Sequence, residues 1–225
     1  MRISLVGAGS MAQAITKHAV KAGHQVMISN SRGPETLVQL SKALGCEAGT
    51  VDEAVTFGEI VFIAIPLVAY SSIPVAPLVG KVVVDLLNYF PHRDGHISEL
   101  QDGEVTTSEF LARHLPQSRI VKAFNAITVE DLEKDARPAN SPDRRALPIG
   151  GNDAEAKKIT TRLVDQLGFD VVDGGSLIET WRFERFRPAY CVPLNKDKLE
   201  RVLSATMRET KVPDGYWLNP RSIPV

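Results

Sequence analysis

The first 32 residues constrain this chain more than any other stretch. An apolar run at residues 3–6 leads directly into a turn that fits the G-x-G-x-x-G/A pattern in its alanine form, Gly7-Ala8-Gly9-Ser10-Met11-Ala12. Small and apolar residues then recur at helical spacing as far as Gly23, a residue suited to a helix end. The pattern predicts a dinucleotide-binding turn, with the backbone N–H groups of residues 10–12 facing a pyrophosphate. The alternative is a tight strand-to-helix turn without a ligand.

The end of the next apolar run indicates which dinucleotide is bound. Residues 26–29 are followed by Asn30, Ser31 and Arg32, where an NAD-preferring site would carry an acidic residue on the ribose. An arginine can instead hold a 2′-phosphate through two parallel hydrogen bonds. The residues therefore favour NADP(H). An ordinary solvent-exposed arginine is the alternative for Arg32.

Composition excludes several classes of function. The chain has 225 residues and a formal net charge of −1, and its acids and bases are mixed, which argues against a nucleic-acid surface. Cys46 and Cys191 lie far apart and suggest reduced thiols, without a metal-type pair. No apolar run is long enough for a bilayer span, and the first strand begins at residue 2. We expect a cytoplasmic protein with no membrane or nucleic-acid partner and no metal.

Strand-like and helix-like segments alternate along the chain, which predicts an α/β fold with a Rossmann-type, doubly wound, mostly parallel sheet. The β-branched runs at residues 59–65 and 81–87 suit central strands. Residues 134–145 are the most loop-like. We expect a dinucleotide-binding domain at 1–176 and a small helical extension with a tail at 177–225. A helix is predicted after Asn195. Tyr216 and Trp217 should dock on this chain or on a neighbouring copy, and the second possibility favours a homodimer.

Ligands of doubly wound sheets lie at the carboxyl ends of the strands. That rule selects three further sets of candidate cofactor-binding residues after later strands: Ile65-Pro66-Leu67, Asn88, and Asn125-Ala126. Proline after a buried strand allows a sharp turn over a flat ring. A simple strand terminator is the alternative for Pro66.

Several of these segments together resemble the family of NADPH-dependent coenzyme F-420 oxidoreductases and their bacterial relatives. The resemblance runs from residue 1 to about residue 178 and rests on residues 7–12, 30–32, 65–66, 121–125 and 151–156. It implies NADP binding, with Ser31 and Arg32 at the 2′-phosphate and Ser10 and Met11 at the pyrophosphate. It also implies that Ile65 and Pro66 flank the cofactor and that Asn125 and Ala126 lie near the nicotinamide. From about Trp181 onward the chain departs from the deazaflavin enzymes.

These observations favour an NADPH-dependent oxidoreductase that transfers hydride to or from a flavin-like, deazaflavin or quinone acceptor, a small planar redox substrate. Such a transfer needs stacked rings more than an acid–base pair, and no catalytic side chain is identified. One alternative is an NADP(H)-binding sensor without turnover. Another is an imine reductase resembling pyrroline-5-carboxylate reductase, which shares the N-terminal turn but needs a longer helical C-terminal domain.

Three other groups are weaker candidates. His92, Asp94 and His96 could be drawn as a metal site, but no further ligand stands at zinc-site spacing. His114 near a helix end suggests a cap. The segment 182–187, with three arginines and two phenylalanines, could bind an acidic aromatic substrate. The favoured interpretation is a helix that packs its aromatic residues inward.

Overall fold

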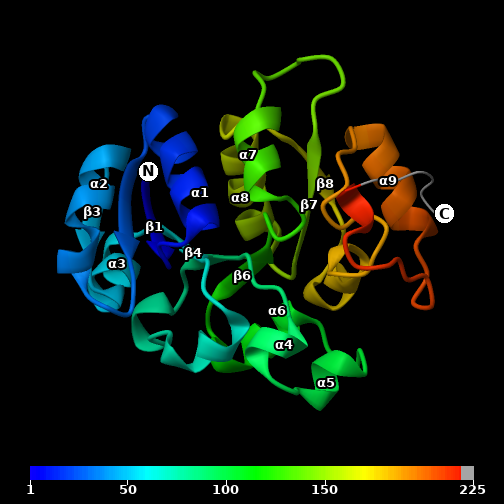
Figure 1. Ribbon diagram of the computed structural model, residues 1–225, viewed down its shortest axis with the longest axis horizontal. Helices are drawn as coiled ribbons and strands as arrows, with labels where there is room; N and C mark the ends of the chain where they lie inside the picture. Colours follow the sequence, from blue (N-terminus) through cyan, green and yellow to red (C-terminus); the bar gives the residue numbers. More distant parts are fainter. Residues whose placement is uncertain (219–225) are drawn as a thin grey trace. The chain divides into compact units, whose positions relative to one another are not determined.

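A computed structural model describes residues 1–218 (Figure 1). Its contacts divide the chain into two compact units, Met1–Ile120 and Val121–Val225. The division falls inside strand β6 (Arg119–Lys122), whereas the sequence suggested a boundary between residues 176 and 177. That boundary stays a prediction, and each unit is described by itself.

Unit 1 is built on five strands. They are β1 (Arg2–Val6), β2 (Gln25–Ser29), β3 (Glu47–Gly49), β4 (Ile60–Ile63) and β5 (Val82–Asp85), in the order β3-β2-β1-β4-β5. Each neighbouring pair is parallel. Residues of β1 pair with both β2 and β4, so the strand order reverses on either side of β1, as in a doubly wound sheet. The predicted α/β, Rossmann-type fold is confirmed.

Burial in unit 1 follows the sequence pattern. Every residue of β4 and β5 is buried, as expected for β-branched strands covered on both faces. Asp85 at the end of β5 is the one charged residue among these buried strand residues. It accepts hydrogen bonds from the Leu87 N–H at 2.8 Å and the Ser108 hydroxyl at 2.5 Å, so its burial is compensated.

The helices of unit 1 begin at recognisable signals. They are α1 (Ser10–Lys21), α2 (Val38–Leu44), α3 (Val51–Phe57), α4 (Pro91–Asp94), α5 (Ser98–Gln101) and α6 (Thr107–His114), with the 3-10 turns η1 (Pro34–Leu37), η2 (Leu67–Ser72) and η3 (Ala76–Leu78). Capping boxes start α3, at Thr50 with Glu53, and α6, at Thr106 with Glu109. The stretch 91–106 contains the two four-residue helices α4 and α5.

Unit 2 contains an antiparallel strand pair, which the alternating pattern of the sequence did not predict. Strand β6 pairs with β7 (Ala146–Gly151) in antiparallel direction, and β7 pairs with β8 (Asp170–Asp173) in parallel. Its other elements are α7 (Val129–Asp135), α8 (Ala154–Gln166), η4 (Leu177–Phe183), α9 (Lys196–Ala205) and η5 (Tyr216–Leu218). Asp153 caps α8, and Asn195 caps the helix predicted after it, α9; each accepts a hydrogen bond from a first-turn N–H.

The aromatic residues near the C-terminus pack on unit 2 itself. Tyr216 and Trp217 lie partly buried against its core, and Trp217 meets Tyr190 edge to face with ring centroids 5.2 Å apart. Docking on this chain is therefore confirmed, and it removes the basis on which a homodimer was expected. The part of the predicted irregular tail at residues 219–225 lies outside the described residues.

The segment 182–187 differs from the prediction. The 3-10 turn η4 ends at Phe183, which is fully buried, and the chain beyond it is irregular, with Phe186 at a positive φ of 68° and half exposed. A regular helix with both phenylalanines inward was therefore wrong. Within residues 1–218, no helix is both long and apolar enough to cross a bilayer.

The loop predicted at residues 134–145 is confirmed from residue 136 onward, between α7 and β7 (Figure 1), whereas residues 134 and 135 belong to α7. Arg144 is buried and donates from Nη1 to Asp165 at 2.6 Å and Asp170 at 2.9 Å. Its Nε donates to the Gly168 carbonyl at 3.1 Å. Neighbouring Arg145 is also buried and pairs with carboxylates of α7. Two buried arginines thus hold the start of β7 in place.

Candidate functional site

The turn after β1 depends on Gly7. Its φ is 120°, in the region that L side chains rarely adopt, and its N–H donates to the Ser29 carbonyl at 3.0 Å. A Cβ at this position would lie 2.2 Å from the Ala64 carbonyl oxygen. The protein's own backbone therefore requires glycine at position 7.

Gly9 is different, because nothing within the described residues requires it. Its φ of −72° and ψ of 176° are open to any residue, and a Cβ there would have no atom within 4 Å. A glycine with free space beside it is what close approach of a ligand to the backbone needs. The space beside Gly9 thus fits a bound pyrophosphate.

The N-terminus of α1 is prepared for an anion. Its first turn holds no acidic residue, and no side chain caps it. The N–H groups of a first turn have no partner inside the helix, and the helix dipole favours negative charge there. Gln13 donates from its side-chain amide to the Ala8 carbonyl at 2.9 Å and so fixes the turn from within. The predicted residues Gly7–Ala12 are together at this terminus.

The loop after β2 is organised by Asn30. Its amide donates to the Thr36 hydroxyl at 2.9 Å, and its side-chain oxygen accepts the Arg32 N–H at 2.9 Å. Asn30 therefore shapes the loop, and Ser31 and Arg32 are exposed upon it. Within residues 1–218, the Arg32 guanidinium forms no hydrogen bond or ion pair with the protein. An exposed arginine without a partner at the end of β2 fits the position of a 2′-phosphate.

A cavity of about 220 Å³ lies at the carboxyl ends of β1, β4 and β5. It is lined by residues from the three strand ends: Gly9, Ser10, Met11, Ala12, Ala64, Ile65, Pro66, Leu86, Asn88, Phe90 and Arg93. The predicted residues Ile65, Pro66 and Asn88 thus lie with the turn. Leu67 does not line it, because its side chain is fully buried, so only its backbone could reach a ligand.

Sequence reasoning missed Phe90 and Arg93. Arg93 lies over the Phe90 ring, with its guanidinium carbon 4.7 Å from the ring centroid. It forms two hydrogen bonds of 2.8 Å to the carboxylate of Asp94, which is buried. Burial alone would raise the pKa of Asp94, but hydrogen bonds from Arg93 and from the N–H groups of Phe90 and Val68 hold it below its ordinary value. The signal available in the sequence was an adjacent Arg–Asp pair soon after a buried strand.

Asn125 and Ala126 belong to unit 2. The Asn125 amide donates to the Phe183 carbonyl at 3.0 Å, and Ala126 is part of the unit's apolar core. Phe124, just before them, adopts a positive φ of 59°, a strained conformation for a bulky residue. Their place at the nicotinamide stays a prediction.

The weaker candidates have ordinary partners. Asp94 is engaged by Arg93, His96 Nδ1 lies 2.8 Å from the Gln101 amide oxygen, and His92 packs on Phe90. His114 does not cap its own helix, since its Nε2 lies 2.9 Å from the Ile73 carbonyl. Among residues 1–218, no group of three potential metal ligands comes together.

Arginines of the 182–187 segment are used inside unit 2. Arg182 and Arg187, together with Arg208, surround the Trp181 ring at 4.6–5.0 Å. Arg182 also donates to the Thr206 carbonyl at 2.7 Å, and Arg187 to the Thr210 carbonyl at 2.6 Å. They fasten the chain after α9 to η4, which accounts for their place without a ligand.

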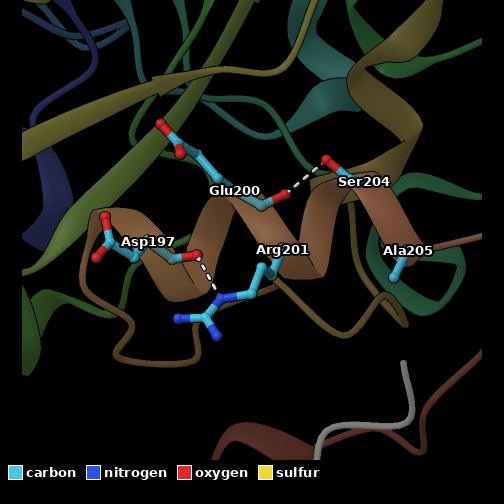
Figure 2. Close-up of a pocket in the computed structure, with 5 residues that line it drawn as sticks. All are labelled: Asp197, Glu200, Arg201, Ser204 and Ala205. Atoms are coloured by element: carbon cyan, nitrogen blue, oxygen red, sulfur yellow. Dashed lines mark hydrogen bonds between the residues drawn. The ribbon is translucent and has the colours of Figure 1, made fainter.

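A second hollow, of about 790 Å³, follows the outer face of α9 and is open to solvent (Figure 2). Its polar groups bond along the helix, with Ser204 donating to the Glu200 carbonyl at 2.8 Å and Arg201 to the Asp197 carbonyl at 3.2 Å. Because these groups do not converge on a common point, this surface is not a binding site of the same kind.

The parallel sheet, the glycine turn and the open cavity define a dinucleotide-binding α/β domain of the Rossmann type. Residues 2–89 match the family model described as "NADP oxidoreductase coenzyme F420-dependent". By this match, that segment of the chain is similar to the coenzyme F420-dependent NADP oxidoreductases, a family whose description implies NADP binding.

Two similar proteins with curated names are also reductases. The chain is 29% identical over 198 residues to Metalloreductase STEAP3 of Rattus norvegicus and 28% over 177 residues to Metalloreductase STEAP2 of Mus musculus, matches that cover 85% and 78% of this chain. The chain spans only 38% and 33% of these two relatives.

Solved structures agree on the fold. Hypothetical protein SMa0349 of Sinorhizobium meliloti has a TM-score of 0.75 at 28% identity, with 88% of this chain and 96% of that chain covered. A candidate F420-dependent NADP reductase of Arthrobacter sp. FB24 has a TM-score of 0.68 at 23% identity, with 81% and 87% covered.

Proposed function

We propose that the chain binds NADPH and is an oxidoreductase that transfers a hydride between the nicotinamide and a planar ring, flavin-like, deazaflavin or quinone. The observation that carries the proposal is the free space beside Gly9 at the uncapped N-terminus of α1, in a turn where Gly7 is required by the protein's own backbone. The match of residues 2–89 to an NADP oxidoreductase family supports it.

The residues of unit 1 have separate tasks in this proposal. First-turn N–H groups of α1 hold the pyrophosphate, since the helix end offers unpaired donors and a favourable dipole. Arg32 holds the 2′-phosphate and thereby selects NADPH over NADH. Ile65 and Pro66, on the wall of the cavity, flank the second half of the cofactor and exclude water from it.

When bound, NADPH supplies the hydride, and the chain supplies orientation. The cavity wall is mostly apolar, and Met11, Ile65, Pro66 and Phe90 offer no proton for the transfer. This agrees with an acceptor ring that takes up hydride while stacked at short range.

The proposal is tested in two stages on the whole chain. Purified protein is first titrated with NADPH and NADH by following nicotinamide fluorescence. It is then mixed with NADPH and, in turn, riboflavin, flavin mononucleotide, a 5-deazaflavin, a quinone and ferric citrate, while the reduced-nicotinamide absorbance is followed. Ferric citrate is included because the curated relatives are named metalloreductases.

We expect NADPH to bind at least about 100-fold more tightly than NADH, as two charge-assisted hydrogen bonds to a phosphate allow. Turnover on one class of ring would support the full proposal. Binding of NADPH without turnover on any acceptor would favour the sensor. Equal binding of the two nucleotides, or none, would overturn it.

A further inference from the structure

We propose that Arg93 is a phosphate-binding residue of the cavity at the ends of β1, β4 and β5. The inference rests on the proposed function, because it concerns the phosphate on the nicotinamide side of bound NADP(H). Nothing in the G-x-G-x-x-A motif points to this residue, which comes 81 positions after Ala12, the last residue of the motif.

Three contacts fix the Arg93 guanidinium before any ligand arrives. Nε and Nη2 each donate to one oxygen of Asp94 at 2.8 Å, and Nη2 also donates to the Asn88 carbonyl at 2.9 Å. The guanidinium carbon lies over the Phe90 ring, 4.7 Å from its centroid. An arginine held at two points loses little further freedom on binding, so each new hydrogen bond costs less entropy.

The opposite edge of the same guanidinium is unused. Within the described part of the chain, no acceptor lies on Nη1, which carries two N–H groups. The Arg93 side chain is 38% exposed, while the Asp94 side chain that holds it is fully buried. Arg93 also lines the cavity together with Gly9 and Ser10. A fixed cation therefore presents two free donors beside the pyrophosphate turn.

Charge in the cavity makes an anion the expected ligand. Among the lining residues, all of them described, Arg93 alone carries a charge. The turn supplies only backbone N–H groups and a partial helix charge, whereas a pyrophosphate carries full negative charges on both phosphates. Both hydrogens of Nη2 are already used, on Asp94 and on the Asn88 carbonyl, so the two N–H groups of Nη1 are the donors left for phosphate oxygens. An acceptor with its own phosphate would offer the same chemistry.

The test compares two ligands that differ in the second half of the dinucleotide. NADPH carries the nicotinamide-side phosphate, whereas 2′,5′-ADP ends at the adenosine-side phosphate. Calorimetry measures both dissociation constants for the wild type, R93M, R93K and the control R113M. Arg113 suits the control because it too lies in unit 1 and pairs with a carboxylate, that of Glu99, but does not line the cavity.

R93M should weaken NADPH binding about 10- to 100-fold, the loss expected for hydrogen bonds to a charged group, and leave 2′,5′-ADP within about 3-fold. R93K should remain weakened, because an ammonium cannot pair with Asp94 at two points and present a second edge. R113M should bind both ligands as the wild type does.

Removal of Arg93 also leaves the buried Asp94 carboxylate without its partner, so R93M alone could lose stability. The double variant R93M/D94N removes that charge as well. It should melt close to the wild type and still bind NADPH as weakly as R93M, which separates a folding defect from a lost phosphate contact.

The outcomes distinguish the sources of the phosphate. If R93M weakens the binding of NADPH but not of 2′,5′-ADP, Arg93 binds the nicotinamide-side phosphate of the cofactor. Unchanged NADPH binding, with a KM raised for flavin mononucleotide but not for riboflavin, assigns the acceptor's phosphate. If R93M changes none of these, or if R93K equals the wild type, the inference is overturned while the proposed function stands. A wild type that binds no NADPH overturns both.

Discussion

Replacing Gly9 with valine and Gly7 with alanine should separate ligand binding from folding. A Cβ at Gly9 meets no atom within 4 Å, and its φ of −72° suits any residue. Gly9→Val should therefore change the free energy of unfolding by less than about 1 kcal/mol, the range of glycine replacements at compatible positions and N-caps.

Gly7→Ala should have the opposite effect. The φ of 120° costs a side chain about 1–3 kcal/mol. The Cβ would also lie 2.2 Å from the Ala64 carbonyl oxygen, a backbone atom that cannot rotate away. Displacing it adds about 1–3 kcal/mol, the scale of overpacking in a core. The total of about 2–6 kcal/mol is a large part of a typical domain's stability of about 5–15 kcal/mol.

Gly9→Val, which should change stability little, should instead weaken NADPH binding strongly. Valine would occupy the space assigned to the pyrophosphate and remove two charge-assisted N–H contacts, worth about 1.5–3 kcal/mol each, so NADPH affinity should fall at least about 100-fold. Urea denaturation followed by circular dichroism gives the stability, and calorimetry gives the affinity. Wild-type affinity in folded Gly9→Val would refute the assignment of this space to the cofactor.

Three further results are expected. Arg32→Glu should weaken NADPH binding far more than NADH binding, because it places a carboxylate against the 2′-phosphate; equal losses by fluorescence titration would remove Arg32 from that site. The Asp94 pKa is held below its ordinary value, so its charged form stabilises the fold above about pH 4 and this contribution is lost as the pH falls further. Melting temperatures of Asp94→Asn should therefore depend less on pH in that acidic range than those of the wild type, and parallel curves would contradict this. Burial raises the pKa of Cys46 to about 11 and of Cys191 to about 12, so at about pH 8 a thiol reagent should label half-buried Cys46 slowly and Cys191 only after urea is added. Rapid labelling of both thiols in the native protein would be inconsistent with that burial.

The elements of the sheet were predictable where one physical cause dominates. The β-branched run around Phe62 leaves no polar face, and the only way to bury it is a central strand. Asn195 has a short side-chain acceptor at the start of a predicted helix, and it caps that helix, α9. Local chemistry is sufficient for these features.

Other features depend on partners distant in the sequence. The direction of β7 relative to β6 leaves no mark on the sequence of either strand. Leu67 looked like part of a strand-end site but is drawn into the core by the turn η2. Arg93 becomes notable only once β5 places it beside the turn of β1, a contact between residues that no local pattern connects.

Hydrogen bonds hold both ends of the loop before β7. The Arg137 N–H donates to the Gly168 carbonyl at 3.0 Å, and the Arg144 side chain donates to the Arg137 carbonyl at 3.1 Å. Only residues 138–143 lie between these fastenings, and two of the six are prolines. The middle of this loop can change conformation, but the loop cannot move as a rigid lid, because both of its ends are held by hydrogen bonds. The amide hydrogen-exchange rate should therefore drop sharply from residue 143 to residue 145. Only the short tip of the loop would then be flexible, and its two ends would be rigid.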